Sequence, residues 1–387
     1  MKSKKLILEF FNSEQSGGFI LLFCTILSLF IANSLVSHYY IDFWHSYLDL
    51  SFLGLNLKYS LEHWINDGLM VIFFLLVGLE IEREIYVGEL SNIKNSLLPI
   101  VAAIGGMVVP GLIHFSFNYN TPYSSGFAIP MATDIAFALG ILALVGKKAP
   151  FSLKIFLTAL AIIDDLGAII IIAIFYTKEL FFNNLLISLG IFALLLIFNK
   201  LKIRYLSIYL LGGFFMWYFM LKSGVHSTIA GVLLAFAIPF DKNNDENISL
   251  KLQHFLHKPV AFIILPVFAL ANTAIIFPQQ IMNSFHNSNS LGIIFGLIFG
   301  KSIGIFGFSY LLVKLNFSKL YENMNWKNLF GTSLIAGIGF TMSIFITNLA
   351  FIDQGIIISS KLSILVASLI AGISGYLILI FKPKQNI

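Results

Sequence analysis

The sequence predicts an all-α integral membrane protein with twelve transmembrane helices. Of its 387 residues, 58% are hydrophobic and only 11% are charged, whereas soluble domains carry about 25% charged residues. Apolar runs of about 20 residues, the length needed to cross a bilayer, recur along the whole chain. Lys and Arg gather in alternate loops between these runs, as expected when the basic loops stay in the cytoplasm.

The composition excludes several other classes of protein. The net charge is only +5 and no basic tract indicates nucleic-acid binding. Cys24 is the single cysteine, so neither an intramolecular disulfide framework nor a thiolate metal cluster is expected. The basic N-terminus would suit a signal peptide, but the apolar run 17–36 is long enough to span a membrane. We therefore interpret this run as a retained helix. No cofactor is expected for this chain.

The twelve predicted spans leave no soluble domain, so the chain is interpreted as a single transmembrane domain, 1–387. The longest loops cover 37–62 and 240–258. The tails and every second loop hold 19 of the 24 basic residues, and the opposite loops hold four. Both termini are therefore predicted to be cytoplasmic. The spans are 17–36, 63–81, 96–117, 125–145, 152–176, 184–199, 205–222, 224–239, 259–278, 291–313, 328–349 and 360–381.

The first long loop contains LDLSFLGLNLKYS, residues 48 to 60. Its alternation of apolar and polar residues on both sides of Leu53-Gly54 favours a small external β-hairpin over about 48–59. An ordered loop without strands is the alternative.

Two of the predicted spans contain helix breakers. Pro130 stands in mid-span in GFAIPMATDIAFALG, residues 126 to 140, and Gly337 and Gly339 interrupt AGIGFTMSIF, residues 336 to 345. The two spans have opposite predicted orientations. Interrupted helices at corresponding places in two halves indicate inverted-topology repeats and a binding site at the midplane, which is a pattern typical of transporters.

Five ionisable residues lie deep in predicted spans: Asp67, Asp134, Asp164, Asp165 and Lys301. Each costs ~2.5–3.5 kcal/mol at the bilayer centre on insertion scales, and such residues indicate function by default. Glu80, close to a predicted helix end, is a weaker case.

Lys301 is the only charge in the run 291–313 and lies too deep to reach the interface, so it needs a carboxylate partner. The adjacent Asp164 and Asp165 are the natural candidates. Their side chains point about 100° apart on a helix, so one can meet Lys301 while the other faces a water-filled cavity. A fixed ion pair between helices, or carboxylates that stay permanently protonated, are the structural alternatives.

An ionised carboxylate offers oxygen ligands to a small hard cation, whereas a protonated one does not. A cation and a proton can therefore compete for Asp164 and Asp165. A helix broken at the midplane exposes N–H or C=O groups with partial charges. We expect Asp134 to compensate the N-terminal ends and Lys301 the C-terminal ends. Thr133 offers a hydroxyl ligand, or simply packs between helices.

At these residues the chain resembles the NhaA family of Na⁺/H⁺ antiporters. The order and spacing of six motifs carry the resemblance, which extends from the second predicted helix to the eleventh. The motifs are WINDGLM (64–70), VGLEIERE (77–84), ATDIAFALG (132–140), LAIIDDLGAIIIIAIFYT (160–177), KSGVHSTIAGV (222–232) and AGIGFTMSIFI (336–346).

The resemblance implies two crossed discontinuous helices within inverted repeats at about 96–176 and 291–381. It implies that Asp165 is the main cation ligand, helped by Asp164 and Thr133, and that Lys301 pairs with Asp164 when the site is protonated. It further implies electrogenic export of Na⁺ or Li⁺ in exchange for protons, regulation of intracellular pH and sodium, and a bacterial inner membrane. A homodimer through the hairpin is also implied, with membrane lipid as the surroundings.

The family loses activity at acidic pH, and the resemblance assigns that response to a second set of residues. They are Asp67, Glu80, Arg83, Glu84, His226, His254 and His257. For His226 a structural hydrogen bond is the favoured interpretation, whereas the other two histidines are equally well interpreted as solvated loop residues. Gln253 departs from the family pattern, which has a glutamate there, so the pH response of this chain is expected to differ.

Antiport is favoured over three alternatives. A cation-coupled solute symporter of similar architecture would need a polar cluster for its solute, and none is clear. An intramembrane aspartyl protease, the enzyme alternative, would carry a G-x-G-D sequence, which is missing. A passive cation channel would be blocked by a buried lysine unless a carboxylate neutralised it.

Overall fold

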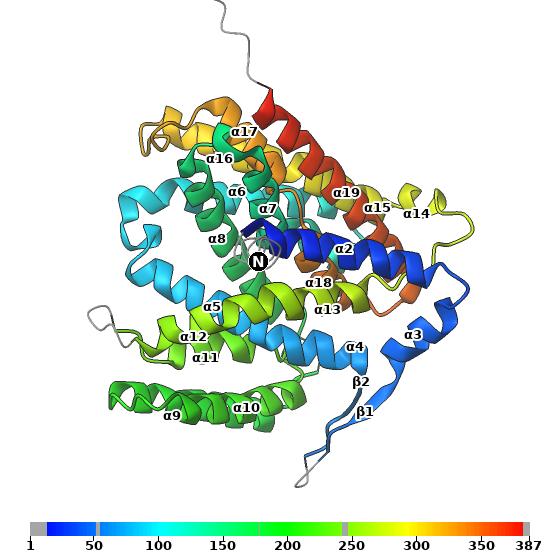
Figure 1. The fold of residues 1–387 in the computed structure, drawn as a ribbon, viewed down its shortest axis with the longest axis vertical. Coiled ribbons are helices and arrows are strands. Elements are labelled where there is room, and N and C mark those ends of the chain that lie inside the picture. The colour runs from blue at the N-terminus through cyan, green and yellow to red at the C-terminus, as the bar shows by residue number, and fades with distance from the viewer. Residues whose placement is uncertain (1–13, 52–54, 178, 242–246, 382–387) are drawn as a thin grey trace, which may run out of the picture. The chain divides into compact units, whose positions relative to one another are not determined.

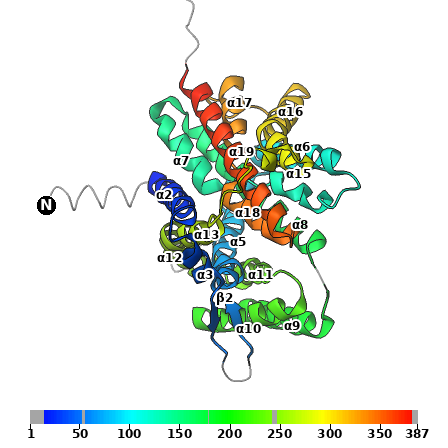
Figure 2. The ribbon, with the colours of Figure 1, turned by 90° about the vertical axis from the view of Figure 1, so that its right-hand side faces the viewer.

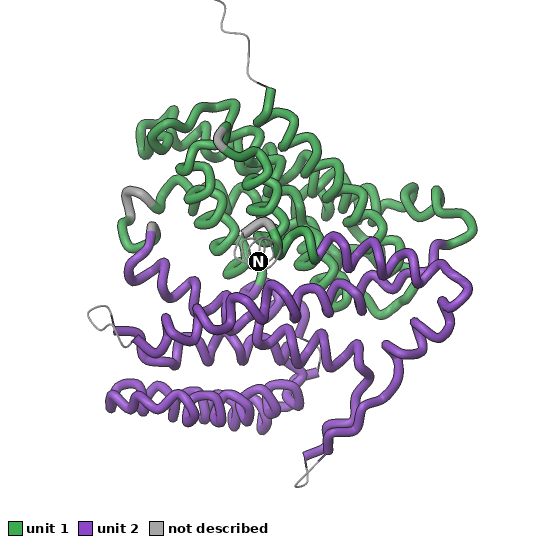
Figure 3. The backbone as a smooth tube through the Cα atoms, in the orientation of Figure 1, with its two compact units in different colours: residues 1–20, 89–168, 278–387 green, residues 21–88, 169–277 purple. Residues whose placement is uncertain are grey.

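The computed structural model describes residues 14–51, 55–177, 179–241 and 247–381. The chain forms two compact units, coloured separately in Figure 3. Unit 1 combines residues 1–20, 89–168 and 278–387, and unit 2 combines residues 21–88 and 169–277. Both are built almost entirely from helices, so the predicted all-α membrane fold is confirmed.

Unit 1 contains two series of elements in the same order. The first is α6 (Ile93–Asn118), the 3-10 segment η3 (Ser124–Met131) followed by α7 (Ile135–Val145), and α8 (Phe151–Phe175), which ends in unit 2. The second is α15 (Ser288–Phe295) continued by the π-helical η6 (Gly296–Gly300) and α16 (Lys301–Lys314), then α17 (Trp326–Ile335) with α18 (Phe340–Ala350), and α19 (Gln354–Ile380). Each series is an intact helix, a broken helix and a long helix, which is the element order that inverted repeats require (Figure 1).

Unit 2 begins within α2 (Glu14–Ala32), which is followed by α3 (Ser37–His45). Its centre is α5 (Met70–Tyr86), which packs against α11 (Ile229–Ala237) and α12 (Ile248–Pro259). The remaining helices α9 (Phe182–Lys200) and α10 (Leu206–Ser223) lie side by side (Figures 1 and 2). Short segments α4 (Leu61–His63) and η1 (Trp64–Leu69) lead into α5, while η5 (Val260–Ile264) and α13 (Leu265–Asn272) continue α12.

The hairpin predicted in the first long loop is confirmed. Strand β1 (Tyr47–Asp49) pairs antiparallel with β2 (Lys58–Ser60), so that Tyr47 lies opposite Ser60. The predicted turn residues Leu53-Gly54 lie outside the described residues. The hydroxyl of Tyr59 accepts a hydrogen bond from Lys222 Nζ at 2.8 Å, which fastens the second strand to α10.

The helix count differs from the sequence-based twelve. Among the described residues, nine helices are long and apolar enough to span a bilayer, or eleven if each bent pair counts as one span. The predicted span 224–239 accounts for much of the difference, because its helix α11 has only nine residues. Nine residues extend about 13 Å, less than half of a bilayer core of about 30 Å. Gly224, in the left-handed region at φ +82°, ends α10, and the residues up to Thr228 are not helical.

The second half of the predicted loop 240–258 is helical in the structure. Helix α12 begins at Ile248, where Asn247 caps it by accepting a hydrogen bond from Leu250 N at 3.3 Å. The helix continues to Asn272, through Pro259. Proline removes a backbone hydrogen bond and usually ends a helix, but here the wider π turn η5 follows it and absorbs the distortion.

Helices α6 and α16 touch through their backbones, and this contact places Lys301 in the interior of unit 1. A Cβ atom on Gly304 would lie 2.1 Å from the carbonyl oxygen of Gly105, and one on Gly105 would lie 2.4 Å from that of Gly304. Small residues at both positions are therefore required for this approach, as in other close-packed membrane helices.

Gly304→Ala should separate α6 from α16 and lower the thermal stability of the purified protein, by about 1–3 kcal/mol for an overpacked contact. Gly307→Ala on the same helix is the matched control, because a Cβ there meets nothing within 4 Å. Its expected effect is neutral, or stabilising by up to ~1 kcal/mol through helix propensity. Equal melting temperatures for the two variants would contradict this account of the packing.

Candidate functional site

The two broken helices of unit 1 meet at their breaks. The first break is the extended stretch 132–134 between η3 and α7, and the second is 336–339 between α17 and α18, whose axes bend by 46°. The backbone groups freed at the breaks bond across to each other. Asp134 N donates to Ile338 O at 2.7 Å, and the Thr133 hydroxyl lies 3.0 Å from Ala336 O. Non-helical backbone at this depth is tolerated because it is satisfied inside the protein.

The carboxylate of Asp134 caps the N-termini of both half-helices at once. Its Oδ1 accepts a hydrogen bond from Phe137 N at 3.0 Å, in the first turn of α7. Its Oδ2 accepts from the backbone N and the hydroxyl of Thr341, at 3.1 Å and 2.5 Å, in the first turn of α18. Negative charge is favourable at helix N-termini. One buried carboxylate therefore satisfies two positive helix ends that point at the same place.

The second carboxylate of the centre, Asp164, is bonded to a buried lysine. Lys301 Nζ lies 2.5 Å from Asp164 Oδ2, and the Thr133 hydroxyl lies 2.7 Å from the same oxygen. Lys301 is fully buried and Asp164 is 1% exposed. The other oxygen, Oδ1, is buried and accepts no hydrogen bond from the described residues. Asp164 thus presents one oxygen held by a cation and one oxygen without a donor.

Asp165, the next residue on α8, is 2% exposed and also acts electrostatically on Lys301. Asp164, Asp165 and Lys301 together carry a charge of −1 when both of these carboxylates are ionised, so a single added cation would neutralise the three groups. Thr133 reaches both Asp164 and the second helix break, and therefore joins the charged centre to the crossed breaks. The structure brings together the residues predicted for ion binding and charge compensation, while their roles in transport stay predictions. They are Thr133, Asp134, Asp164, Asp165 and Lys301.

The local fold aims Lys301 at this centre. The π-helical segment η6 ends at Gly300, directly before Lys301. A π turn inserts one extra residue and rotates everything that follows, and such turns are frequent at functional sites. A Cβ on Gly300 would lie 2.7 Å from Pro110 Cα, and the Cβ position of Gly106 lies 3.8 Å from Lys301 Cδ. Glycines thus let α6 press against the aliphatic stem of Lys301.

The Na⁺/H⁺ antiporter 1 family matches residues 8–379. The chain belongs to this family. The resemblance drawn from the motifs is thereby confirmed.

The antiporter is similar to named relatives over its whole length. The Na⁺/H⁺ antiporter NhaA of Flavobacterium psychrophilum is 59% identical over 387 residues, which cover 100% of this chain and 99% of the relative. NhaA of Dechloromonas aromatica is 55% identical over 389 residues, with 100% and 98% covered. NhaA of Cytophaga hutchinsonii is 53% identical over 385 residues, with 100% and 97% covered.

The residues predicted for the pH response lie in unit 2 of the antiporter, in two groups. The first surrounds Asp67 on η1, whose Oδ1 accepts from the Ser227 hydroxyl at 2.8 Å. His226 Nδ1 lies 3.7 Å from Asp67 Oδ1, and His63 Nδ1 lies 3.5 Å from Asp67 Oδ2. Trp217 Nε1 donates to the backbone carbonyl of Asp67 at 2.6 Å.

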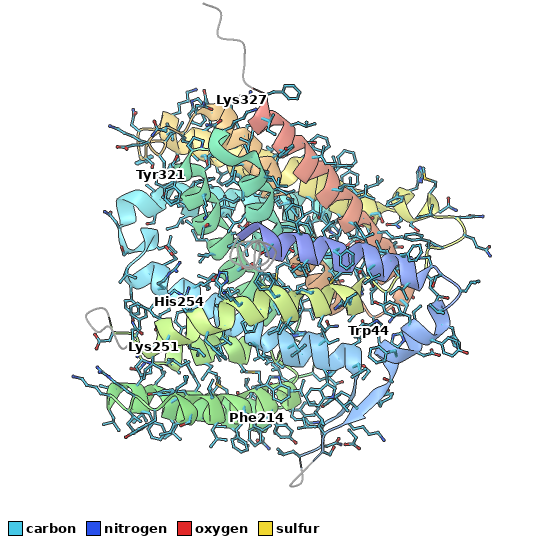
Figure 4. The ribbon with its side chains drawn as sticks, viewed as in Figure 1. Trp44, Phe214, Lys251, His254, Tyr321 and Lys327 are labelled. Carbon is cyan, nitrogen blue, oxygen red and sulfur yellow. The ribbon has the colours of Figure 1, made fainter. Side chains whose placement is uncertain are left out.

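The second group lies on α5 and α12. Glu84 is buried and accepts from Arg83 Nη2 at 2.7 Å, and Glu80 lies half-buried one turn earlier. His254 and His257 are exposed on α12 (Figure 4 labels His254), so they are helical residues and not loop residues as predicted.

Two functional candidates were missed by the sequence reasoning. Thr341 lies in the stretch AGIGFTMSIF but was not singled out, yet it supplies both donors to Asp134 Oδ2. Glu82 was placed just beyond the predicted span 63–81, whereas α5 continues to Tyr86 and Glu82 is buried on it. Thr341 could have been found from its place just after the break at Gly337 and Gly339, where a new helix begins, whereas the burial of Glu82 depends on packing against α12.

Asp134→Ala should remove both caps and cost about 1–4 kcal/mol of stability, because a single N-cap contributes about 0.5–2 kcal/mol. Asp353→Ala is the matched control. Asp353 caps only α19, through Ile356 N at 2.9 Å, and is exposed. Thermal unfolding of the two variants in the same detergent measures the difference, and a smaller loss for Asp134→Ala than for Asp353→Ala would refute the double cap.

Lys301→Ala should lower stability by about 3–5 kcal/mol, because it leaves the carboxylate of Asp164 buried and unpaired. Adding Asp164→Asn to this variant removes the uncompensated charge and should restore part of the loss. Melting curves of the single and double variants test the pair. An unchanged curve for Lys301→Ala would show that the contact contributes nothing to the fold.

Proposed function

We propose that this antiporter exports Na⁺ in exchange for protons through the centre formed by Asp164, Asp165 and Thr133. The observation that carries the proposal is the difference between the two carboxylate oxygens of Asp164. Lys301 and Thr133 hold its Oδ2, while its Oδ1 accepts no hydrogen bond from the described residues. Buried carboxylate oxygens without a donor are costly unless a proton or a cation occupies them.

The exchange follows from competition for the same oxygens. In the proton-loaded state, Lys301 keeps its bond to Asp164 and a proton neutralises Asp165. When Na⁺ binds to Asp165 and Asp164, with Thr133 as a further oxygen ligand, the added charge weakens the hold of Lys301 on Asp164. Release of protons accompanies loading of Na⁺, and neither ion crosses alone. From the family resemblance we propose that more than one proton returns for each Na⁺, so that the exchange is electrogenic. Asp165 releases one proton, and Lys301, once its bond to Asp164 is lost, releases the other.

Asp134 and Lys301 serve in charge compensation. Asp134 balances the two positive helix ends that it caps, and its bonds are independent of those of Asp164. It therefore keeps the crossed breaks together in both loading states. The positive charge of Lys301 balances the Asp164–Asp165 pair. We propose that it also compensates the partial negative charge at the C-terminal ends of the broken helices.

The finer features of this proposal come from the family resemblance. We propose that Li⁺ is also carried, that activity depends on pH through the two groups of unit 2, and that the antiporter regulates intracellular pH and sodium. We propose a homodimer through the hairpin β1–β2, repeats at about 96–176 and 291–381, and a bacterial inner membrane with both termini cytoplasmic. The matching element order of the two series in unit 1 supports the repeats.

The alternative of a cation-coupled solute symporter gains no support. The relatives named above are Na⁺/H⁺ antiporters. Within the described part of unit 1, the polar side chains of the centre bond to one another and to the crossed backbone, and supply no separate cluster that would recognise an organic solute.

Asp165→Asn should abolish the dissipation of a pH gradient by Na⁺ in inverted membrane vesicles, because a neutral amide cannot take up a proton and has no negative charge to attract the cation. The protein should remain in the membrane at the wild-type level. Asp42→Asn makes the same change at an exposed position and should transport normally. Continued Na⁺-dependent proton flux in Asp165→Asn would remove this residue from the transport site.

A further inference from the structure

Ser343 is a fully buried residue whose hydroxyl joins the two broken helices of unit 1. It lies near the start of α18, just after the second break. Its Oγ donates a hydrogen bond to the carbonyl oxygen of Ile129 at 2.7 Å. Ile129 lies two residues before the end of η3, in the first broken helix. The bond therefore runs from the second broken helix back to the first.

The bonded carbonyl belongs to the C-terminal end of a half-helix. A helix leaves its last carbonyl groups without partners of its own, and these groups carry partial negative charge. After Met131 the backbone is extended, with Ala132 at φ −80° and ψ 152°, so the helix does not continue to supply donors to Ile129. Within a membrane protein such a group must be satisfied by the protein itself. Ser343 provides that hydrogen bond.

Thr133 and Ser343 form a reciprocal pair of contacts between the broken helices. The Thr133 hydroxyl, in the first break, lies 3.0 Å from Ala336 O of the second broken helix. The Ser343 hydroxyl makes the opposite contact, to Ile129 O of the first. The two differ because Thr133 also lies 2.7 Å from Asp164 Oδ2 in the charged centre. The bond of Thr133 therefore depends on what Asp164 binds, whereas the bond of Ser343 holds the helix end in every loading state.

The chain between Ile129 and Thr133 is short and constrained. Residues 130–132 are all buried. The ring of Pro130 fixes its φ angle, and Pro130 packs against η6, since a Cβ on Gly296 would lie 2.7 Å from Pro130 Cβ. A link of this kind has few alternative conformations. The position of the Ile129 carbonyl therefore sets the position of the Thr133 hydroxyl.

We infer that Ser343 is a positioning residue for the transported cation, because its bond to Ile129 fixes the Thr133 oxygen beside the carboxylates. Groups behind a ligand orient it and thereby raise its affinity for the ion. Ser343 is not itself a ligand, since its hydroxyl is directed at the end of η3. Lys301 contributes charge at the helix ends, whereas Ser343 contributes a directional hydrogen bond. The inference rests on the proposed function, because it acts through Thr133 as a cation ligand.

Ser343→Ala should raise the KM for Na⁺ of Na⁺/H⁺ exchange in inverted vesicles by about three- to tenfold, the value of one hydrogen bond. The maximal rate per molecule of protein should be retained. Ser363→Ala is the matched control, because it removes an equally buried hydroxyl that bonds within its own helix, to Ser359 O at 2.8 Å. Its KM should equal that of wild type. A purely structural role for Ser343 would lower the maximal rate and leave KM unchanged, and that result would overturn the inference.

A double-variant cycle with Thr133→Val tests whether Ser343 acts through Thr133. Thr133→Val removes the hydroxyl ligand with little change of shape and should itself raise the KM for Na⁺. If Ser343 positions this ligand, Ser343→Ala adds nothing in the Thr133→Val background, and the double variant has the KM of Thr133→Val. Two effects that multiply would contradict the inference, since Ser343 would then act on the cation by another route.

Ser343→Cys keeps the test valid if Ser343→Ala does not fold. A thiol is a weak donor, so this variant should also raise KM above the wild-type value and should also add nothing to Thr133→Val. A wild-type KM in Ser343→Cys would count against the assignment.

The same assays separate this inference from the proposed function. An unchanged KM in Ser343→Ala, with a raised KM in Thr133→Val, would overturn the inference and leave the proposed function intact. An unchanged KM in Thr133→Val would remove Thr133 from the transport site and overturn both.

Discussion

The structure of unit 1 depends on one constraint: two helices are interrupted in the membrane, and their freed backbone groups must be satisfied without water. The backbone groups of each break are satisfied by hydrogen bonds to the other break. Asp134 N bonds to the carbonyl of Ile338, and the Asp134 carboxylate bonds to donors at the start of both α7 and α18. Neither break is stable alone, because each supplies the partners that the other lacks. The crossed arrangement is thus a consequence of hydrogen bonding.

This constraint also explains why the centre is rich in charge. An acidic side chain at two converging helix N-termini is stabilised by them, so Asp134 is tolerated where an isolated carboxylate would not be. Asp164 has a different support, the ammonium of Lys301. The two carboxylates are thus held by unrelated means. A change in the ionisation of Asp164 can therefore leave the helix crossing intact, which an exchanger needs in order to load different ions on one scaffold.

The sequence was sufficient for the features that depend on composition and spacing. Long apolar runs predicted the helices, period-2 alternation predicted the strands β1 and β2, and a charge without a local partner predicted that Lys301 needs an acid. It was insufficient where tertiary contacts decide. Apolarity could not show that α11 stops after nine residues, nor that α12 passes through Pro259 into a π turn. The burial of Glu82 was missed for the same reason, since it depends on packing against α12.

The hydroxyl of Thr133 links the occupancy of the centre to the crossed breaks. It has a single proton, and two acceptors compete for it: Asp164 Oδ2 at 2.7 Å and the carbonyl of Ala336 at 3.0 Å. While Asp164 is ionised and binds no metal ion, the carboxylate is the stronger acceptor. In the proposed exchange, a cation bound there draws the Thr133 oxygen towards itself and directs the hydroxyl proton to Ala336. Loading of the ion would then strengthen a hydrogen bond at the second helix break, so that the site and the crossed breaks are coupled through Thr133.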